Sequence, residues 1–141
     1  MPVSSRCAAE AGFKQLTLEY CQELKSLPDG LELLTALESL RIAHCFRFKV
    51  LSPRIGDLGA TLQELTLLDL RTLEMLTARV GDLTALKTFN LCSLYLLRTL
   101  PETLGNLTGL QFLRVSFCPL LKTLPASVGR LRALRMHEEV V

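Results

Sequence analysis

The chain has 141 residues, of which 49% are hydrophobic, 6% aromatic and 21% charged, and its formal net charge is +2. Charges of both signs are interspersed, which excludes the basic stripe of a nucleic-acid-binding protein, and no run of about eighteen apolar residues exists that would span a membrane. The five cysteines are an odd number, and the N-terminal residues lack the apolar core of a secretory signal. We therefore expect a cytoplasmic protein with free thiols.

The sequence repeats itself at an almost constant interval. An anchor leucine, often followed by proline, recurs about every two dozen residues. The anchor positions are Leu27, Leu51, Leu76, Leu100 and Leu124. Aligning the turns on this leucine gives eight columns in which every residue is apolar. Such a period predicts a solenoid in which each turn buries its apolar side against its neighbours.

The elements follow in chain order. Residues 1–12 are too few for a full turn, and we expect a partial cap or a disordered segment there. A repeat domain of about five repeats follows at 13–136, and in each turn five residues alternate between apolar and other types, as in a β-strand. The predicted parallel strands are 15–19, 39–43, 64–68, 88–92 and 112–116. The tail 137–141 breaks the pattern, because His137 and Glu139 occupy positions where leucine is expected.

The second half of each turn reads L-P-x-x-L-G-x-L, most clearly in "LPETLGNL" and "LPASVGRL". Proline can open a helical turn, and glycine can end it by adopting a positive φ. The pattern therefore predicts one α- or 3₁₀-helical turn on the outer side, and it leaves the choice between the two open. Long helices are disfavoured, because proline or glycine recurs every dozen residues or so.

The cysteine at 118 could be a nucleophile, a metal ligand, half of a disulfide or a packing residue. Cys118 shares its column with Cys21 and Cys45, and two other turns carry leucine there, so the column predicts packing. A disulfide between Cys21 and Cys45 is geometrically allowed in adjacent turns, but we do not expect it. No C-x-x-C pair exists, so we predict no metal site. Cys92 is the one thiol of the repeat expected to point away from the core.

The histidines do not indicate catalysis. His44 adjoins Cys45, but successive residues at a strand end diverge, so the two side chains should not meet. We therefore predict a protein that is not an enzyme and holds no cofactor.

The turn L-x-x-L-x-L-x-x-C-x-x-L-x-x-L-P-x-x-L-G-x-L resembles the leucine-rich repeat. The match is closest in "LRVSFCPLLKTLPASVGRL" and "LCSLYLLRTLPETLGNLTGLQFL", and these turns are most similar to those of plant intracellular disease-resistance receptors. The resemblance implies a curved α/β solenoid with parallel strands on its concave face and loops with short helical or 3₁₀ turns on its convex face. It also implies recognition of another protein in defence signalling. The family's G-x-x-x-x-G-K-[ST] nucleotide-binding motif does not occur in the chain.

The side chains between the buried positions of each strand vary from turn to turn and are expected to face the concave side. Aromatic residues and arginine dominate protein-binding surfaces. The predicted partner-binding residues on this face and just beyond it are Tyr20, Arg41, His44, Glu64, Leu68, Asp69, Asn90, Phe112, Arg114 and Phe117. The alternative is a solvated face that has no ligand of its own.

Three functions remain open from the sequence. The first is a non-catalytic module that binds another protein, with neither nucleic acid nor membrane as a partner. The second is a structural scaffold or a truncated repeat fragment. The third is the substrate-recognition part of a larger enzyme such as a ubiquitin ligase. A short solenoid also exposes core at its ends, which predicts weak self-association through them.

Overall fold

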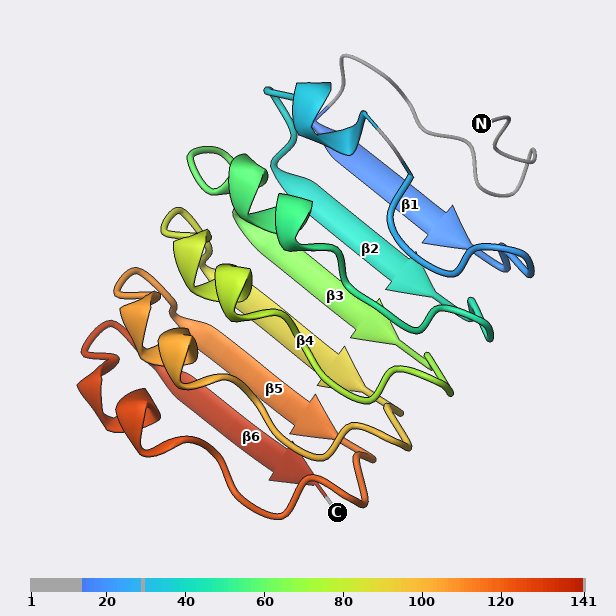
Figure 1. Cartoon of the computed structure of the whole chain (residues 1–141). Helices are drawn as coiled ribbons and strands as arrows, with labels where there is room; N and C mark the ends of the chain where they lie inside the picture. Colours follow the sequence, from blue (N-terminus) through green and yellow to red (C-terminus); the bar gives the residue numbers. More distant parts are fainter. Residues whose placement is uncertain (1–13, 29, 141) are drawn as a thin grey trace.

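The computed structural model of the chain describes residues 14–28 and 30–140. Six short parallel strands form one sheet, in which each strand is hydrogen-bonded to the next one in the sequence (Figure 1). The strands are β1 (Gln15–Glu19), β2 (Ser39–Ala43), β3 (Glu64–Leu68), β4 (Thr88–Cys92), β5 (Phe112–Ser116) and β6 (Met136–Val140). The first five strands have the predicted bounds, so the alternation of side chains was read correctly.

The register of the sheet repeats the period of the sequence. Leu40 of β2 pairs with Leu16 on one side and with Leu65 on the other, and Phe89 pairs with Leu65 and Leu113. Equivalent residues of successive turns therefore lie side by side, which confirms the predicted stack of turns. A mismatch of one residue would turn every apolar side chain to the opposite face of the sheet.

The return path of each turn carries a 3₁₀-helix, which decides between the two predicted helix types. These helices form a second layer beside the sheet (Figure 1). They are η2 (Leu31–Leu33), η3 (Pro53–Leu58), η4 (Ala78–Asp82), η5 (Glu102–Asn106) and η6 (Ala126–Arg130). Among the described residues, no helix is long and apolar enough to cross a membrane.

The caps explain why the proline of the motif is dispensable. Pro101 and Pro125 stand at the N-caps of η5 and η6. Helix η4 has no proline, and the side chain of its N-cap Thr77 accepts a hydrogen bond from the backbone N–H of Arg79. In η3 the N-cap Ser52 accepts the equivalent bond from Arg54, and Pro53 follows it at the first helical position. A hydroxyl that satisfies a free amide can replace a ring that presets φ.

The glycine of the motif has a different role from the predicted one. Gly30 is the only glycine with a positive φ in the described part of the chain. Gly81 and Gly105 lie inside η4 and η5, where a Cβ would come within 2.7 Å of the backbone oxygens of Thr103 and Ser127 in the next turn. These glycines permit close approach between turns, and the prediction that they end the helix with a positive φ was wrong.

The core lies between the sheet and the 3₁₀ layer. Leu40, Leu65 and Phe89 are fully shielded from solvent, as are most of the other residues of the eight apolar columns. The described members that are only partly buried are Leu34, Leu124, Val128 and Leu134, which lie in the first and last turns. Incomplete burial at the ends is what a stack of interdependent turns predicts.

The cysteine column packs into this core. The thiols of Cys45 and Cys118 are buried and free, and Cys45 Sγ donates to the carbonyl oxygens of Ala43 at 3.4 Å and Leu18 at 3.6 Å. Burial raises the pKa of both thiols above the ordinary value of a cysteine. The predicted packing role is therefore confirmed, and no disulfide joins Cys21 to Cys45. Cys21 is nevertheless disulfide-bonded, so the prediction of free thiols was wrong for this residue.

The two ends differ from the sequence interpretation in one respect. Strand β6 extends the sheet past residue 136, and it pairs Leu113 with His137 and Val115 with Glu139. Backbone pairing therefore continues into the segment 137–141, where the apolar pattern is broken. The predicted segment 1–12 lies outside the described residues.

Candidate functional site

The carboxyl ends of the first five strands share an unusual backbone conformation. The residue that follows each strand has a positive φ of 53–56° although it is not glycine. These five residues, which we call the rim, are Tyr20, His44, Asp69, Ser93 and Phe117. The backbone N–H groups of the first four donate to a carbonyl of the next turn at 2.9–3.1 Å. The left-handed residue thus adds one backbone hydrogen bond to those between neighbouring strands, and it turns the chain back toward the core.

The left-handed conformation costs about 1–2 kcal/mol for residues other than glycine, and aspartate tolerates it better than bulky residues do. Because it recurs in every one of these turns, it belongs to the architecture of the repeat. Its consequence for function is the direction of the side chains. Tyr20 and Phe117 are held with 45% and 53% of their surface exposed.

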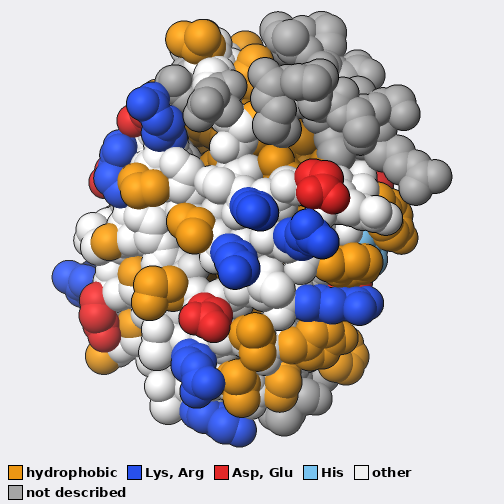
Figure 2. Space-filling model, turned by 45° about the vertical axis from the view of Figure 1, so that its right-hand side comes forward, with side chains coloured by type: hydrophobic (Ala, Val, Ile, Leu, Met, Phe, Trp, Pro, Cys, Tyr) orange, Lys and Arg blue, Asp and Glu red, His pale blue; other side chains and the backbone are white. Residues whose placement is uncertain are grey.

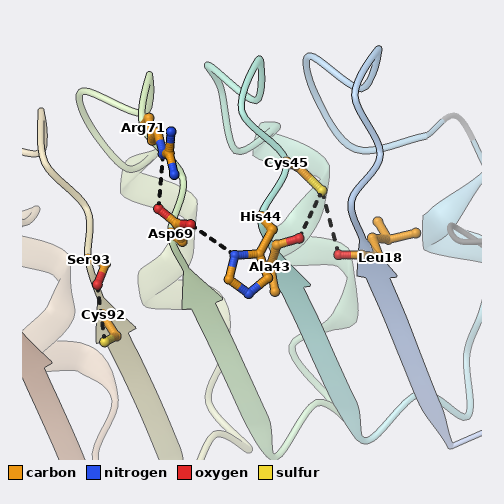
Figure 3. Close-up of polar contacts among 8 residues, drawn as sticks. All are labelled: Leu18, Ala43, His44, Cys45, Asp69, Arg71, Cys92 and Ser93. Carbon is orange, nitrogen blue, oxygen red and sulfur yellow. Dashed lines mark hydrogen bonds and ion pairs between the residues drawn. The ribbon is translucent and has the colours of Figure 1, made fainter.

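Three rim residues join two residues of the following loops in one cluster. The rings of Tyr20 and His44 are stacked, with centroids 4.7 Å apart and planes inclined by 12°. His44 Nδ1 lies 2.9 Å from Asp69 Oδ2, and Arg71 Nε donates to Asp69 Oδ1 at 3.3 Å (Figure 3). The guanidinium of Arg71 lies 4.1 Å from the centroid of the Phe46 ring, and that ring meets His44 edge-on. We call these five residues the rim cluster.

The charge of Asp69 decides which groups of the rim cluster donate hydrogen bonds and which accept them. Burial raises the pKa of its carboxyl, but hydrogen bonds from His44 and Arg71 outweigh this effect and hold the pKa below its ordinary value. Asp69 is therefore ionised at neutral pH and can only accept hydrogen bonds. It follows that His44 carries its proton on Nδ1 and donates it to the carboxylate.

The arrangement does not match a nucleophilic centre. His44 points along the rim to Asp69, while Cys45 points into the core, so the two side chains diverge as predicted (Figure 3). Along the rim the carboxylate of Asp69 lies between His44 and Ser93, whereas a Ser-His-Asp triad needs the imidazole in the middle. Within residues 14–28 and 30–140, no three His, Cys, Asp or Glu side chains gather as metal ligands.

The open face of the sheet is formed by the side chains of β1 to β5 that point away from the core. Arg41, Asn90 and Arg114 stand at the middle position of their strands. Asn90 Nδ2 donates to Thr66 Oγ1 of the preceding strand at 3.3 Å. Leu68 is half-buried at the end of β3, and its register partner Ala43 at the end of β2 is fully buried.

The amino ends of the strands border a polar groove of about 370 Å³. Glu64 is one of its lining residues and accepts a hydrogen bond from Ser39 Oγ at 3.3 Å. Lys14 forms an ion pair with Glu38 at 3.8 Å along the same edge. Phe112 is 37% exposed at the start of β5, one residue after Gln111 of the groove lining.

Three solved structures of leucine-rich-repeat proteins and a receptor have folds similar to that of this chain. The leucine-rich-repeat domain of the type III effector XopL is 25% identical, has a TM-score of 0.80 and aligns with 89% of this chain. A plant peptide hormone receptor, RGFR1 in complex with RGF2, is 22% identical with a TM-score of 0.68 over 84% of this chain. The Leptospira interrogans leucine-rich-repeat protein LIC12759 is 25% identical with a TM-score of 0.58 over 94%.

The chain has a leucine-rich-repeat fold. It spans 44% of the XopL chain, 19% of the RGFR1 chain and 37% of the LIC12759 chain. No protein family model and no curated protein matches the sequence.

The leucine-rich-repeat geometry divides the predicted site residues among three places. The rim holds Tyr20, His44, Asp69 and Phe117, and the open face holds Arg41, Leu68, Asn90 and Arg114, with Glu64 and Phe112 at its amino-end edge. Tyr20, His44 and Asp69 are the predicted residues that lie in the rim cluster.

Sequence reasoning missed Phe46 and Arg71, which complete the rim cluster. Each lies two residues after a rim residue, in a loop where no alternation marks the direction of a side chain. The available signal was their shared phase, because Phe46 and Arg71 occupy the same position in neighbouring turns of the repeat. An aromatic residue and an arginine at equivalent positions of adjacent turns can form a cation–π contact.

Proposed function

We propose that this chain is a non-catalytic recognition module that binds another protein through the open face of its sheet and the adjoining rim. The observation that carries the proposal is a contrast between the two sides of each strand. The inward columns are uniformly apolar, whereas the outward positions change from turn to turn and expose rings of Tyr20, Phe112 and Phe117. Exposed aromatic side chains near arginines are typical of protein-binding hot spots.

The comparisons support the general class of this function. RGFR1 is a receptor for a peptide hormone and was solved with RGF2 bound, and it shares the fold of this chain. The sequence resemblance to plant disease-resistance receptors supports a finer proposal, namely that recognition serves defence signalling. A leucine-rich-repeat fold by itself does not distinguish these uses, because one fold hosts many functions.

We also propose that the module works in the cytoplasm. The free thiols of Cys45, Cys92 and Cys118 support this location, since cysteines in oxidising compartments are mostly paired. The disulfide of Cys21 argues in the opposite direction. Thiol titration of the chain isolated from its native cells, with alkylation during lysis, tests the location: a fully reduced chain supports the cytoplasm, and an intact disulfide contradicts it.

The binding proposal is tested by changing Arg41, Phe112 and Arg114 together to alanine. The wild-type chain should capture a saturable protein partner from native lysate, and the triple variant should lose it. A control variant that changes Leu33, Arg130 and Arg132 to alanine removes two arginines and one exposed apolar residue away from the open face. Capture that survives in the triple variant, or is lost equally in the control, would contradict an open-face site.

A further inference from the structure

The segments that lead from the rim to the 3₁₀-helices carry an excess of positive charge. These strand-to-helix turns are residues 20–27, 44–51, 69–76, 93–100 and 117–124, and they contain six Lys or Arg and three Asp or Glu residues. Two of the three acidic side chains are already neutralised. Glu23 pairs with Arg47 at 3.4 Å, and Asp69 pairs with His44 and Arg71.

The remaining basic residues form a column on the surface of these turns. Lys25, Lys49, Arg98 and Lys122 occupy the same phase of successive turns, are exposed and form no ion pair within the described residues. The fifth member of the column is Glu74. Neighbouring turns are about 4.8 Å apart, so the column concentrates positive charge along the stack. The interspersed charges of the sequence did not predict this local alignment, which arises because equivalent positions of successive turns are stacked.

Exposed apolar side chains accompany this charge. Val50 and Met75 are 53% and 66% exposed, and Tyr95 and Leu96 are 44% and 37% exposed. Figure 2 turns the carboxyl ends of the strands toward the viewer and shows basic side chains interspersed with hydrophobic ones on this side of the molecule. A surface that combines apolar groups with unpaired cations is suited to a partner with the opposite charge and apolar groups of its own.

Arg71 is the best-oriented cation of this surface. Its Nε bonds to Asp69, and its guanidinium plane lies over the ring of Phe46. The loop that carries Phe46 is held in turn by Thr72 Oγ1, which donates to the carbonyl oxygen of Phe46 or Phe48 at 3.3 and 2.8 Å. The nitrogen of Arg71 that bonds to Asp69 is Nε, and 57% of the side chain is exposed to solvent.

We infer that the strand-to-helix turns bind an acidic segment of a protein partner, with one carboxylate on the terminal nitrogens of Arg71. An arginine that is already fixed at Nε loses little freedom when its other edge receives a carboxylate in bidentate geometry. The basic column then attracts further carboxylates, and Val50, Met75 and Leu96 contact the apolar side chains between them. This inference deepens the proposed function, on which it rests, by naming the chemistry of the partner.

Nucleic acid fits the same surface less well. Glu74 interrupts the basic column, whereas a phosphate backbone presents an unbroken line of negative charge.

The test uses the full chain and two fluorescent peptides in an anisotropy titration. One peptide alternates Asp and Glu with Leu and Phe, and the other replaces each acid by its amide. The acidic peptide should bind more tightly than the amide peptide, and added salt should weaken it. Arg71→Gln should lower affinity for the acidic peptide about tenfold or more, as expected for loss of a charge-assisted hydrogen bond.

Two further variants supply an independent test of the surface and a control. Lys49→Gln removes a cation of the column that holds no partner, and it should weaken binding severalfold even if Arg71→Gln disturbs the rim cluster. Arg130→Gln removes the same charge from η6 and should leave affinity unchanged. Equal affinity for both peptides, equal effects of all three variants, or tighter binding of a single-stranded oligonucleotide of matched charge would overturn the inference.

The outcome can be separated from that of the proposed function. If the open-face triple variant loses its lysate partner while Arg71→Gln retains both partner and acidic peptide, the inference fails and the proposed function stands. If Arg71→Gln and Lys49→Gln lose the acidic peptide while the open-face variant retains its lysate partner, the inference stands and the open-face site fails.

Discussion

The close approach of successive turns can be tested with two glycines that have equivalent positions in the repeat. Gly105 lies in η5 and faces the next turn, while Gly129 lies in η6, where an added methyl group would meet no atom of a neighbouring segment within 4 Å. The same Gly→Ala substitution therefore adds one methyl group in a crowded and in an open environment. Because neither glycine has a positive φ, the backbone conformation accepts alanine at both positions.

The size of the effect follows from the distances. An alanine Cβ at 105 would lie 2.5 Å from Ser127 Cβ and 2.7 Å from Ser127 O. The turn with η6 would have to retreat by about 0.9 Å to bring the 2.5 Å contact back to the 3.4 Å of ordinary contact, which would also strain the 2.7 Å bond from Ser127 Oγ to Glu102 O. Overpacking of this kind costs about 1–3 kcal/mol. The gain from a stiffer unfolded chain is about 0.4–1 kcal/mol at either position.

Gly105→Ala should therefore lower the free energy of unfolding by about 1–2 kcal/mol, and Gly129→Ala should leave it unchanged or raise it slightly. Urea unfolding followed by circular dichroism, with the slope of each transition compared, measures both values on the same chain. If the two variants had equal stability, or if Gly105→Ala were the more stable, the turns would not be packed as closely as these distances require.

Three further results are expected. Leu65→Ala should reduce the free energy of unfolding by about 2–5 kcal/mol in the same urea assay, because Leu65 is fully buried in the central turn, and a loss below about 1 kcal/mol would contradict this. Asp69→Asn should cost about 1 kcal/mol at pH 7. The folded pKa of Asp69 lies below the unfolded value of about 3.9, so the stability advantage of the wild type is fully present above pH 3.9. The advantage should vanish as the pH falls through the folded pKa. A stability difference that did not depend on pH would refute the ionised state of Asp69 in the cluster. A thiol reagent should label Cys92 in the native chain but reach Cys45 and Cys118 only on unfolding, because the latter two thiols are buried and have a raised pKa. Equal labelling rates for all three cysteines would contradict the packing of Cys45 and Cys118 in the core.

The strands could be predicted to the residue because burial imposes a strict alternation on them. Leu65 and Leu67 must point inward while Thr66 points outward, and the same pattern recurs five times with a nearly fixed spacing. The period also predicted that equivalent residues of neighbouring turns pair, as Leu65 does with Phe89. Repetition turns a weak local signal into a reliable one.

The features that escaped prediction depend on contacts that no apolar pattern records. The role of Gly105 depends on the distance to the next turn, which the residue type alone does not give. Pairing of β6 relies on backbone hydrogen bonds, so it tolerates His137 and Glu139 where the pattern requires leucine.

The candidate site was predicted only in part for a similar reason. Tyr20, His44 and Asp69 were recognised because they follow directly after strands whose direction was known. Phe46 and Arg71 lie further along irregular loops, and their contact depends on side-chain conformations in two different turns. The left-handed backbone of the rim was also missed, because Tyr20 and Phe117 are residue types that rarely adopt it.

The most direct test of the fold is an NMR measurement of proximity across the stack. Phe89 lies between its register partners Leu65 and Leu113, which belong to the preceding and the following turn. The leucine-rich-repeat architecture predicts strong nuclear Overhauser effects from the Phe89 ring to the methyl groups of both leucines, together with amide protons in β2 to β5 that exchange slowly. A Phe89 ring that contacts neither leucine, or sequential amide contacts typical of long helices, would contradict the stacked-turn fold on which the site and both proposals depend.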